Sequence, residues 1–215
     1  MLSDRGADVR VLACEDLSVA GWRHDPGSPD TSVVVVGGEA IAAAGIEGVL
    51  TRRSRVLEWE LARIVPADRP YVAAEMTAFL RSWLSGLGCP VLNPPVSTCL
   101  SGPGWCREEW VRAAAHLGIP VRPVRWRLDD SADAPEDEPA FTATVVGERC
   151  LGAANHASSR WAQLLARAAG VDLLAVRFGE TKSGIELIDA DPWPDVSEPE
   201  VADEILEYFG EGRRW

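Results

Sequence analysis

Lysine is nearly absent from this chain. Lys182 stands alone among 21 Lys and Arg residues, so the other 20 are arginines. Enzymes often place the compact lysine cation on phosphates or use it in Schiff bases, and burial shifts its pKa readily. The sequence therefore restricts any chemistry that depends on several lysines. The abundance of Ala, Arg, Gly, Pro and Val also fits a GC-rich coding sequence, which accounts for part of the shortage.

Long apolar runs are also missing. No window approaches the roughly 18 uninterrupted apolar residues that a membrane helix requires. The first ten residues are polar and charged, and they lack the basic and then apolar order of a signal peptide. We expect a cytoplasmic protein that has no membrane partner.

Paired cysteines are missing as well. The chain has five cysteines, an odd number, and none forms a CxxC pair. In a reducing compartment such residues are expected to be buried small side chains or free thiols. Cys99, Cys106 and His116 are a weak alternative as zinc ligands, because their spacing matches no standard pattern.

The charge balance is strongly acidic. Net charge is -12, with 33 acidic against 21 basic residues, which disfavours nucleic acid as a partner. Much of the excess lies in residues 128–139 and 189–211. We interpret both stretches as solvated segments or helix faces.

The first half of the chain alternates strand and helix patterns. Apolar runs predict short strands at 9–13, 33–36, 46–50 and 90–92, and helical periodicity predicts helices at 71–87 and 104–116. This order predicts an α/β domain over residues 1–127, with an open, largely parallel sheet and flanking helices.

The second half has a different pattern. The acidic segment 128–139 is expected to be a linker or exposed loop. Beyond it we predict a hairpin at 141–151, a helix capped by Ser158, strands at 171–178 and 185–188, and a helix at 199–208. Residues 140–215 are therefore expected to form a smaller α+β lobe.

Several short motifs together resemble a known family. They are Tyr71-Val-Ala-Ala-Glu75, Pro90-Val-Leu-Asn-Pro-Pro95, Ala113-Ala-Ala-His-Leu-Gly-Ile-Pro120, Val145-Val-Gly-Glu148, Ala169-Gly-Val-Asp-Leu-Leu-Ala-Val176 and Gly184-Ile-Glu-Leu-Ile-Asp-Ala-Asp191. The pattern is similar to ATP-grasp ligases, in the branch that modifies peptides and amino acids. The resemblance implies an N-terminal domain like theirs, followed by the C-terminal part of an ATP-grasp domain.

The sequence departs from that family in places that matter for catalysis. The resemblance implies a subdomain that folds over the nucleotide and supplies lysines, but only residues 128–141, without lysine, lie between the matching halves. Arg107 stands where the family usually has lysine, and Arg177 stands where it has a metal carboxylate. These departures suggest a shortened, degenerate member of the family.

Asp189 and Asp191 are the best candidates for a functional site. They occupy the family's final metal-ligand pair, and as alternate residues of a strand end both can face one hard cation. Arg177 would compete with that cation, so a salt bridge between Arg177 and Asp189 is the simpler expectation. Glu186, three residues from Asp189, is expected on the opposite face of the strand.

The three histidines lack a recognisable catalytic setting. His156, beside Asn155, is a weak candidate for a general base, because no nucleophile accompanies it. His24 lies in a loop predicted at 21–31, and His116 lies near a helix end. Neither needs a function.

Two functions follow from the resemblance and its departures. The first is a non-catalytic accessory protein that binds a peptide or amino acid for a partner enzyme, with no cofactor, and with Arg107, Arg125, Arg149 and Arg177 as ligand-binding residues. The alternative is an active minimal ATP-dependent carboxylate–amine ligase that uses ATP and Mg, with arginines in place of the phosphate lysines. A partner subunit would complete it. A homo-oligomer is compatible with both.

Overall fold

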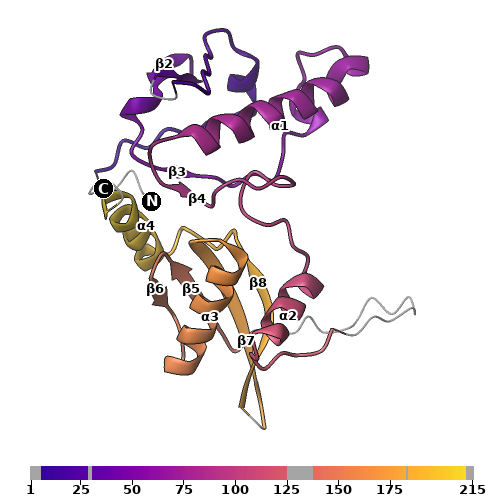
Figure 1. Ribbon diagram of the computed structural model, residues 1–215, viewed down its shortest axis with the longest axis vertical. Coiled ribbons are helices and arrows are strands. Elements are labelled where there is room, and N and C mark those ends of the chain that lie inside the picture. Colours follow the sequence, from indigo (N-terminus) through magenta and orange to yellow (C-terminus); the bar gives the residue numbers. More distant parts are fainter. Residues whose placement is uncertain (1–5, 29–30, 125–137, 183, 212–215) are drawn as a thin grey trace. The chain divides into compact units, whose positions relative to one another are not determined.

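The computed structural model describes residues 6–28, 31–124, 138–182 and 184–211 (Figure 1). The chain divides into two compact units. Unit 1 comprises the chain up to Gly102 together with the part from Ala202 onward, and unit 2 is Pro103–Val201. These divisions differ from the predicted domains 1–127 and 140–215. The predicted acidic linker lies outside the described residues except for positions 138 and 139.

Unit 1 is built from short strands and one long helix. Its elements are η2 (Cys14–Ser18), β1 (Val33–Val36), β2 (Glu39–Ala42), η4 (Ala43–Gly45), β3 (Val49–Leu50), η5 (Glu58–Glu60), η6 (Pro66–Asp68), α1 (Arg69–Gly86), β4 (Val91–Leu92) and most of α4 (Pro199–Glu211). β1 and β2 form an antiparallel hairpin, whereas β3 and β4 pair in parallel.

The parallel sheet of unit 1 is smaller than expected. The predicted strand at 33–36 pairs back onto residues 39–42, because Gly37 and Gly38 both adopt positive φ and reverse the chain at once. Among the described residues of unit 1, parallel pairing is therefore limited to β3 and β4. The strand predicted at 9–13 does not form.

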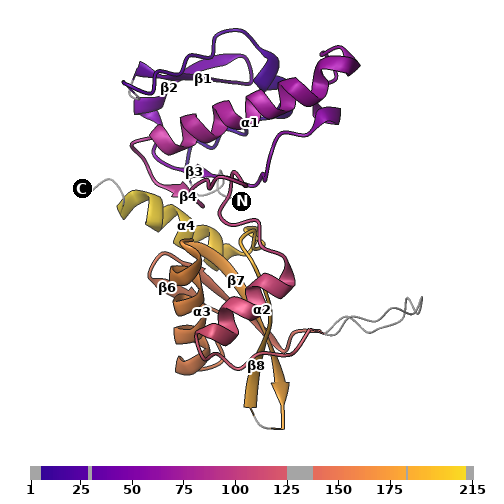
Figure 2. The ribbon, with the colours of Figure 1, turned by 45° about the vertical axis from the view of Figure 1, so that its right-hand side comes forward.

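The core of unit 1 lies around α1, which is placed between the β1–β2 hairpin and the β3–β4 pair (Figure 2). Leu80, Trp83 and Leu84 of α1 pack in one cluster with Val34 of β1. At the end of the chain, Phe209 of α4 packs against Gly48, where a Cβ would lie 2.4 Å from the aromatic ring.

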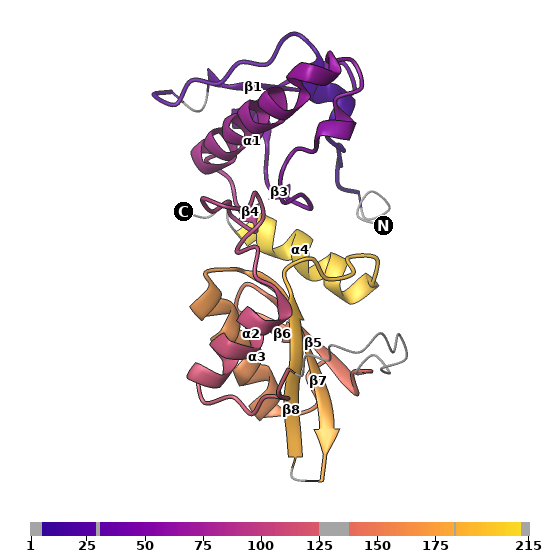
Figure 3. The same cartoon turned by 90° about the vertical axis from the view of Figure 1, so that its right-hand side faces the viewer.

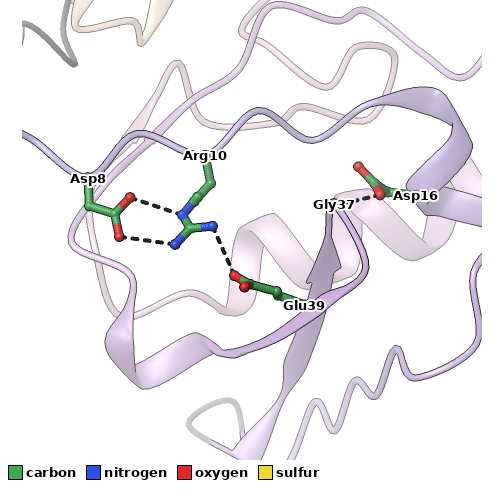
Figure 4. A network of polar contacts seen from close by, with 5 residues as sticks. All are labelled: Asp8, Arg10, Asp16, Gly37 and Glu39. Atoms are coloured by element: carbon green, nitrogen blue, oxygen red, sulfur yellow. Dashed lines mark hydrogen bonds and ion pairs between the residues drawn. The ribbon is translucent and has the colours of Figure 1, made fainter.

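Polar contacts connect residues 8–16 to the β1–β2 hairpin (Figure 4). The carboxylate of Asp16 is buried and accepts hydrogen bonds from the Ala13 and Gly37 backbone N–H groups, at 3.0 and 2.9 Å. On the surface, Arg10 pairs with Asp8 and Glu39, each at 2.9 Å. Asp16 thus ties η2 to the hairpin turn and needs no further role.

Unit 2 is a four-stranded antiparallel sheet with helices on one face. Its elements are α2 (Arg107–His116), β5 (Phe141–Val146), β6 (Arg149–Leu151), α3 (His156–Ala169), β7 (Leu173–Thr181) and β8 (Gly184–Asp191). The strand order is β6-β5-β7-β8. Val121 lies parallel beside Leu187 at the outer edge of β8. The predicted hairpin, the predicted strands and α+β organisation of this lobe are confirmed.

Helices α2 and α3 lie on the same side of this sheet (Figure 3). Trp110 of α2 and Leu165 of α3 pack in one cluster with Val145, Val176, Phe178 and Leu187 from alternate strand positions. This packing explains why α2 belongs to unit 2, although the sequence placed it in the N-terminal domain.

Helix α3 begins earlier than predicted. Asn155 is its N-cap, and the Asn155 side chain accepts from the Ser158 N–H at 3.0 Å. The Ser158 hydroxyl in turn accepts a hydrogen bond from the Asn155 N–H at 3.2 Å. The two residues therefore form a capping box, in which Ser158 is the third helical residue. His156 is the first residue of the helix and is exposed. Within the described ranges, no helix is both long and apolar enough to cross a bilayer.

Candidate functional site

Arg177 of β7 joins the two candidate aspartates of β8. Arg177 and Asp189 are direct cross-strand partners, and Asp191 lies one pleat further along β8. The Arg177 Nη1 lies 3.3 Å from Asp189 Oδ2, and its Nη2 lies 3.6 Å from Asp191 Oδ2. The salt bridge expected between Arg177 and Asp189 is confirmed, and the same guanidinium also reaches Asp191.

The second oxygen of each carboxylate is bonded to the backbone. Asp189 Oδ1 accepts from the Ala190 N–H, and Asp191 Oδ1 accepts from the Trp193 N–H, both at 2.8 Å. All four carboxylate oxygens are therefore engaged within the protein. The side chains of Asp189 and Asp191 are 22% and 35% exposed, so the pair is only partly open to solvent.

The environment of Asp189 opposes its ionisation. Burial raises the pKa of Asp189 above its ordinary value, and the nearby charge of Asp191 raises it further. The hydrogen bond from Ala190 and the charges of Arg177 and Arg107 offset part of this rise. Burial is the largest cause.

An extra residue in β8 shapes this site. Leu187 pairs with Phe178 and Asp189 pairs with Arg177, so Ile188 is a β-bulge without a partner on β7. The Ile188 carbonyl accepts a hydrogen bond at 3.2 Å from the Nε of Arg107, which is the first residue of α2. Arg107 thereby fixes the bulge and adds a second cation near Asp189.

The bulge corrects the prediction made for Glu186. Glu186 pairs with Gly179, and Asp189 pairs with Arg177, two residues away on β7 and hence on the same face. Counting positions without the bulge placed Glu186 on the opposite face, which is wrong. Glu186 lies instead beside Arg122, with 3.7 Å between its Oε2 and the Arg122 Nε.

Arg122 adds a further positive charge beside Glu186 and over β7. Its guanidinium lies over Gly179, where a Cβ would be 2.3 Å from Nη2 and 3.0 Å from the Ile188 Cδ1. Only glycine leaves room for that arrangement. One face of β7 and β8 therefore carries Arg122, Arg177, Glu186, Asp189 and Asp191.

The remaining predicted residues do not join this cluster. Arg149 lies on β6, at the other edge of the sheet and three strand spacings from β8, roughly 14 Å. It is exposed and pairs in register with Val146. Arg125 lies outside the described residues. Lys182 is exposed in the turn between β7 and β8.

The donor set does not fit a divalent cation in this arrangement. Hard cations need several free oxygen ligands, but both carboxylates are bonded to Arg177 and to backbone N–H groups. In the part of the chain that the structure describes, no three His, Cys, Asp or Glu side chains are grouped to hold a metal. The sequence identified Arg177 as a competitor and Arg107 as a ligand-binding candidate, but it did not predict that Arg122 lies beside Glu186.

No protein-family profile and no curated protein matches the chain. Solved structures do match it. The macrocyclase MdnC from Microcystis aeruginosa MRC, bound with precursor peptide MdnA, is 12% identical with a TM-score of 0.66, over 91% of this chain and 89% of its own. The ATP-grasp ligase PsnB, complexed with a phosphomimetic variant of minimal precursor, Mg and ADP, is 11% identical with a TM-score of 0.69. That alignment covers 99% of this chain and 92% of PsnB.

These similarities support the predicted fold. They do not test whether the chain is a shortened, degenerate relative of these enzymes, which stays a prediction. At such low identity they carry no residue roles across to this protein. The mixed α/β class is confirmed, and over most of its length the chain has the fold of ATP-grasp ligases.

Proposed function

We propose that this protein is an ATP-grasp-fold accessory protein that binds a peptide or amino acid for a modifying system and does not hold Mg-ATP. The observation that carries this proposal is the double pairing of Arg177 with Asp189 and Asp191. A tethered guanidinium occupies the side of both carboxylates where a cation would have to approach. Removing it would require breaking two ion pairs before any metal could bind.

The ligand class follows from the fold and is itself part of the proposal. MdnC and PsnB were crystallised with their precursor peptides, which makes a peptide the first ligand to test here. Arg107, Arg149 and Arg125 remain our candidates for contacts to anionic groups of that ligand. Arg149 would act apart from Arg107, since it lies at the β6 edge whereas Arg107 contacts β8.

Calorimetry with ATP and MgCl2 tests the proposal directly. The wild-type protein is expected to give no metal-dependent heat of binding. Arg177→Ala frees one oxygen on each aspartate and is expected to produce measurable Mg2+ or Mn2+ binding. Arg167→Ala is the matched control, because Arg167 also pairs with a carboxylate, Glu148, on the surface of the same unit. Tight, Mg-dependent binding of ATP by the wild-type protein would overturn the proposal.

The alternative is an active ATP-dependent carboxylate–amine ligase. One observation favours it: the alignment with PsnB, which was crystallised with Mg and ADP, covers 99% of this chain and 92% of PsnB. In that case the chain's own arginines would neutralise the phosphates, as bidentate groups can. ADP release should then appear with amino-acid or peptide acceptors, alone or with a partner protein. No turnover in any combination removes this alternative.

A further inference from the structure

A histidine in unit 1 is held between two serine hydroxyls. His24 lies in the loop before β1, Ser32 directly precedes β1, and Ser82 lies on α1. The His24 Nε2 is 2.8 Å from Ser82 Oγ, and its Nδ1 is 3.3 Å from Ser32 Oγ. His24 and Ser82 are 58 positions apart in the chain, so the fold brings them together.

The environments of the two serines differ. Ser32 is 1% exposed, and its Oγ also accepts a hydrogen bond from the Asp25 backbone N–H at 3.2 Å. Ser82 is exposed to solvent. The His24 and Phe79 rings lie nearly perpendicular to each other, with 5.7 Å between their centroids. The imidazole is thus fixed from inside the unit, and the solvent-facing partner is a potential nucleophile.

We propose that Ser82 and His24 form a nucleophile and general-base pair that accepts an activated acyl group. The arrangement has the three parts that such chemistry needs: a hydroxyl, a base within hydrogen-bond reach and a group that orients the base. With its proton on Nδ1, donated to Ser32 Oγ, His24 presents an unprotonated Nε2 to the Ser82 hydroxyl. This inference does not depend on the proposed function.

The covalent step is an acyl transfer. Ser82 Oγ attacks the carbonyl carbon of the acyl donor and forms an ester bond. The bond from that carbon to the leaving group breaks with its electron pair, and the hydroxyl proton passes to His24 Nε2. His24 Nε2 then gives this proton to the departing group and is again a base. Water attacks the carbonyl carbon of the Ser82 ester, and its proton passes through His24 Nε2 to Ser82 Oγ as the ester bond breaks, so that the net reaction is hydrolysis of the donor.

The position of Ser82 limits the class of substrate. Ser82 lies inside the 18-residue helix α1, where backbone N–H groups are used in the helical hydrogen bonds. They cannot stabilise a developing oxyanion. The donor must therefore have a good leaving group, as an aryl ester, a thioester or an acyl phosphate has.

Acetylation by p-nitrophenyl acetate tests the pair. Release of p-nitrophenolate is followed by absorbance, and the acetylated residue is located by mass spectrometry of peptides after acid quench. Ser82 is expected to be acetylated first, and His24→Gln is expected to slow this roughly a hundredfold. Ser82→Ala should abolish the modification. Ser85→Ala is the matched control, because Ser85 is exposed one turn further along α1 and should not matter.

Circular dichroism of each variant verifies that unit 1 remains folded. In a folded His24→Gln protein, an unchanged rate of Ser82 acetylation would overturn the proposal. Acetylation of Ser85 and Ser82 at equal rates in the wild-type protein would overturn it as well, since His24 would then confer no reactivity.

Discussion

Arg177 and Asp189 face each other across β7 and β8, and the guanidinium that bonds Asp189 at 3.3 Å also lies 3.6 Å from Asp191. One cation thus serves two carboxylates that would otherwise repel each other. The arrangement has consequences for stability, for pH dependence and for the neighbouring residues of the sheet.

Arg177→Ala is expected to lower the free energy of unfolding by about 1 kcal/mol. The loss is modest because the Arg177 side chain is 42% exposed and water screens the pairs. The two aspartates are left facing each other without a cation between them. Urea denaturation at neutral pH measures the change. Arg167→Ala, which removes a more exposed pair, should cost less, and an equal cost in both variants would contradict this view.

The raised pKa of Asp189 predicts how stability depends on pH. Because burial raises the pKa of Asp189 in the folded state, the folded protein retains this proton at pH values where the unfolded chain has lost it. The contribution of Asp189 to stability therefore falls as pH rises from the ordinary aspartate value through the raised folded pKa. It stays at its lower level above that range.

NMR titration of the side-chain carboxyl carbons measures this shift, and Asp189 should titrate above the usual aspartate range. Asp189→Asn should remove its share of the pH dependence from urea denaturation curves. Asp25→Asn, an exposed aspartate of unit 1, serves as the control. Titration of Asp189 below the ordinary value would show that its ion pairs outweigh burial.

Gly179→Ala is expected to disturb Arg122 rather than the backbone. The new Cβ would lie 2.3 Å from the Arg122 Nη2, so the flexible guanidinium must move away from Glu186. Because the flexible end of Arg122 can move aside, we expect a loss of no more than about 1 kcal/mol in the free energy of unfolding. In the double variant with Arg122→Ala, this loss should be smaller. Strict additivity of the two changes in a double-mutant cycle would argue against the contact.

Gly48→Ala tests the packing of α4 in unit 1. The Phe209 ring lies 2.4 Å from the position of the added Cβ and, unlike a guanidinium, has no flexible end that can swing away. We expect a loss of about 2–3 kcal/mol, and Gly48→Ala should cost less in a Phe209→Ala background than in the wild-type protein. Gly45→Ala is the control, since nothing lies within 4 Å of a Cβ there. Thermal melts of the wild-type protein, the three single variants and the double variant measure these effects, and an equal cost of Gly48→Ala in both backgrounds would contradict the contact.

Local patterns in the sequence were sufficient for much of the fold. Periodic apolar residues predicted α1, and the apolar and threonine alternation beside Gly147 predicted the β5–β6 hairpin. The Arg177–Asp189 salt bridge was also expected, because the resemblance places both residues at metal-ligand positions of the ATP-grasp family. In these cases the signal lies within a few residues of the feature.

Features that depend on distant contacts were not predictable in the same way. The bulge at Ile188 has no local marker, since an apolar residue fits a regular strand equally well, and it reversed the predicted face of Glu186. The contact of His24 with Ser82 joins positions 58 residues apart. The sequence therefore contained no sign that His24 lies next to Ser82. The packing of α2 on β8 was missed for the same reason, because these elements are also far apart in the chain.

Helix α4 gives the chain an unusual order of assembly. Unit 1 contains residues up to Gly102 and from Ala202 onward, so all of unit 2 is translated before Phe209 can reach Gly48. At about 5–20 residues per second, a ribosome would need roughly 5–20 s for that interval. Unit 2 has its whole sequence in one stretch and can fold first. A truncation or cleavage near the C-terminus would then damage the unit that begins the chain.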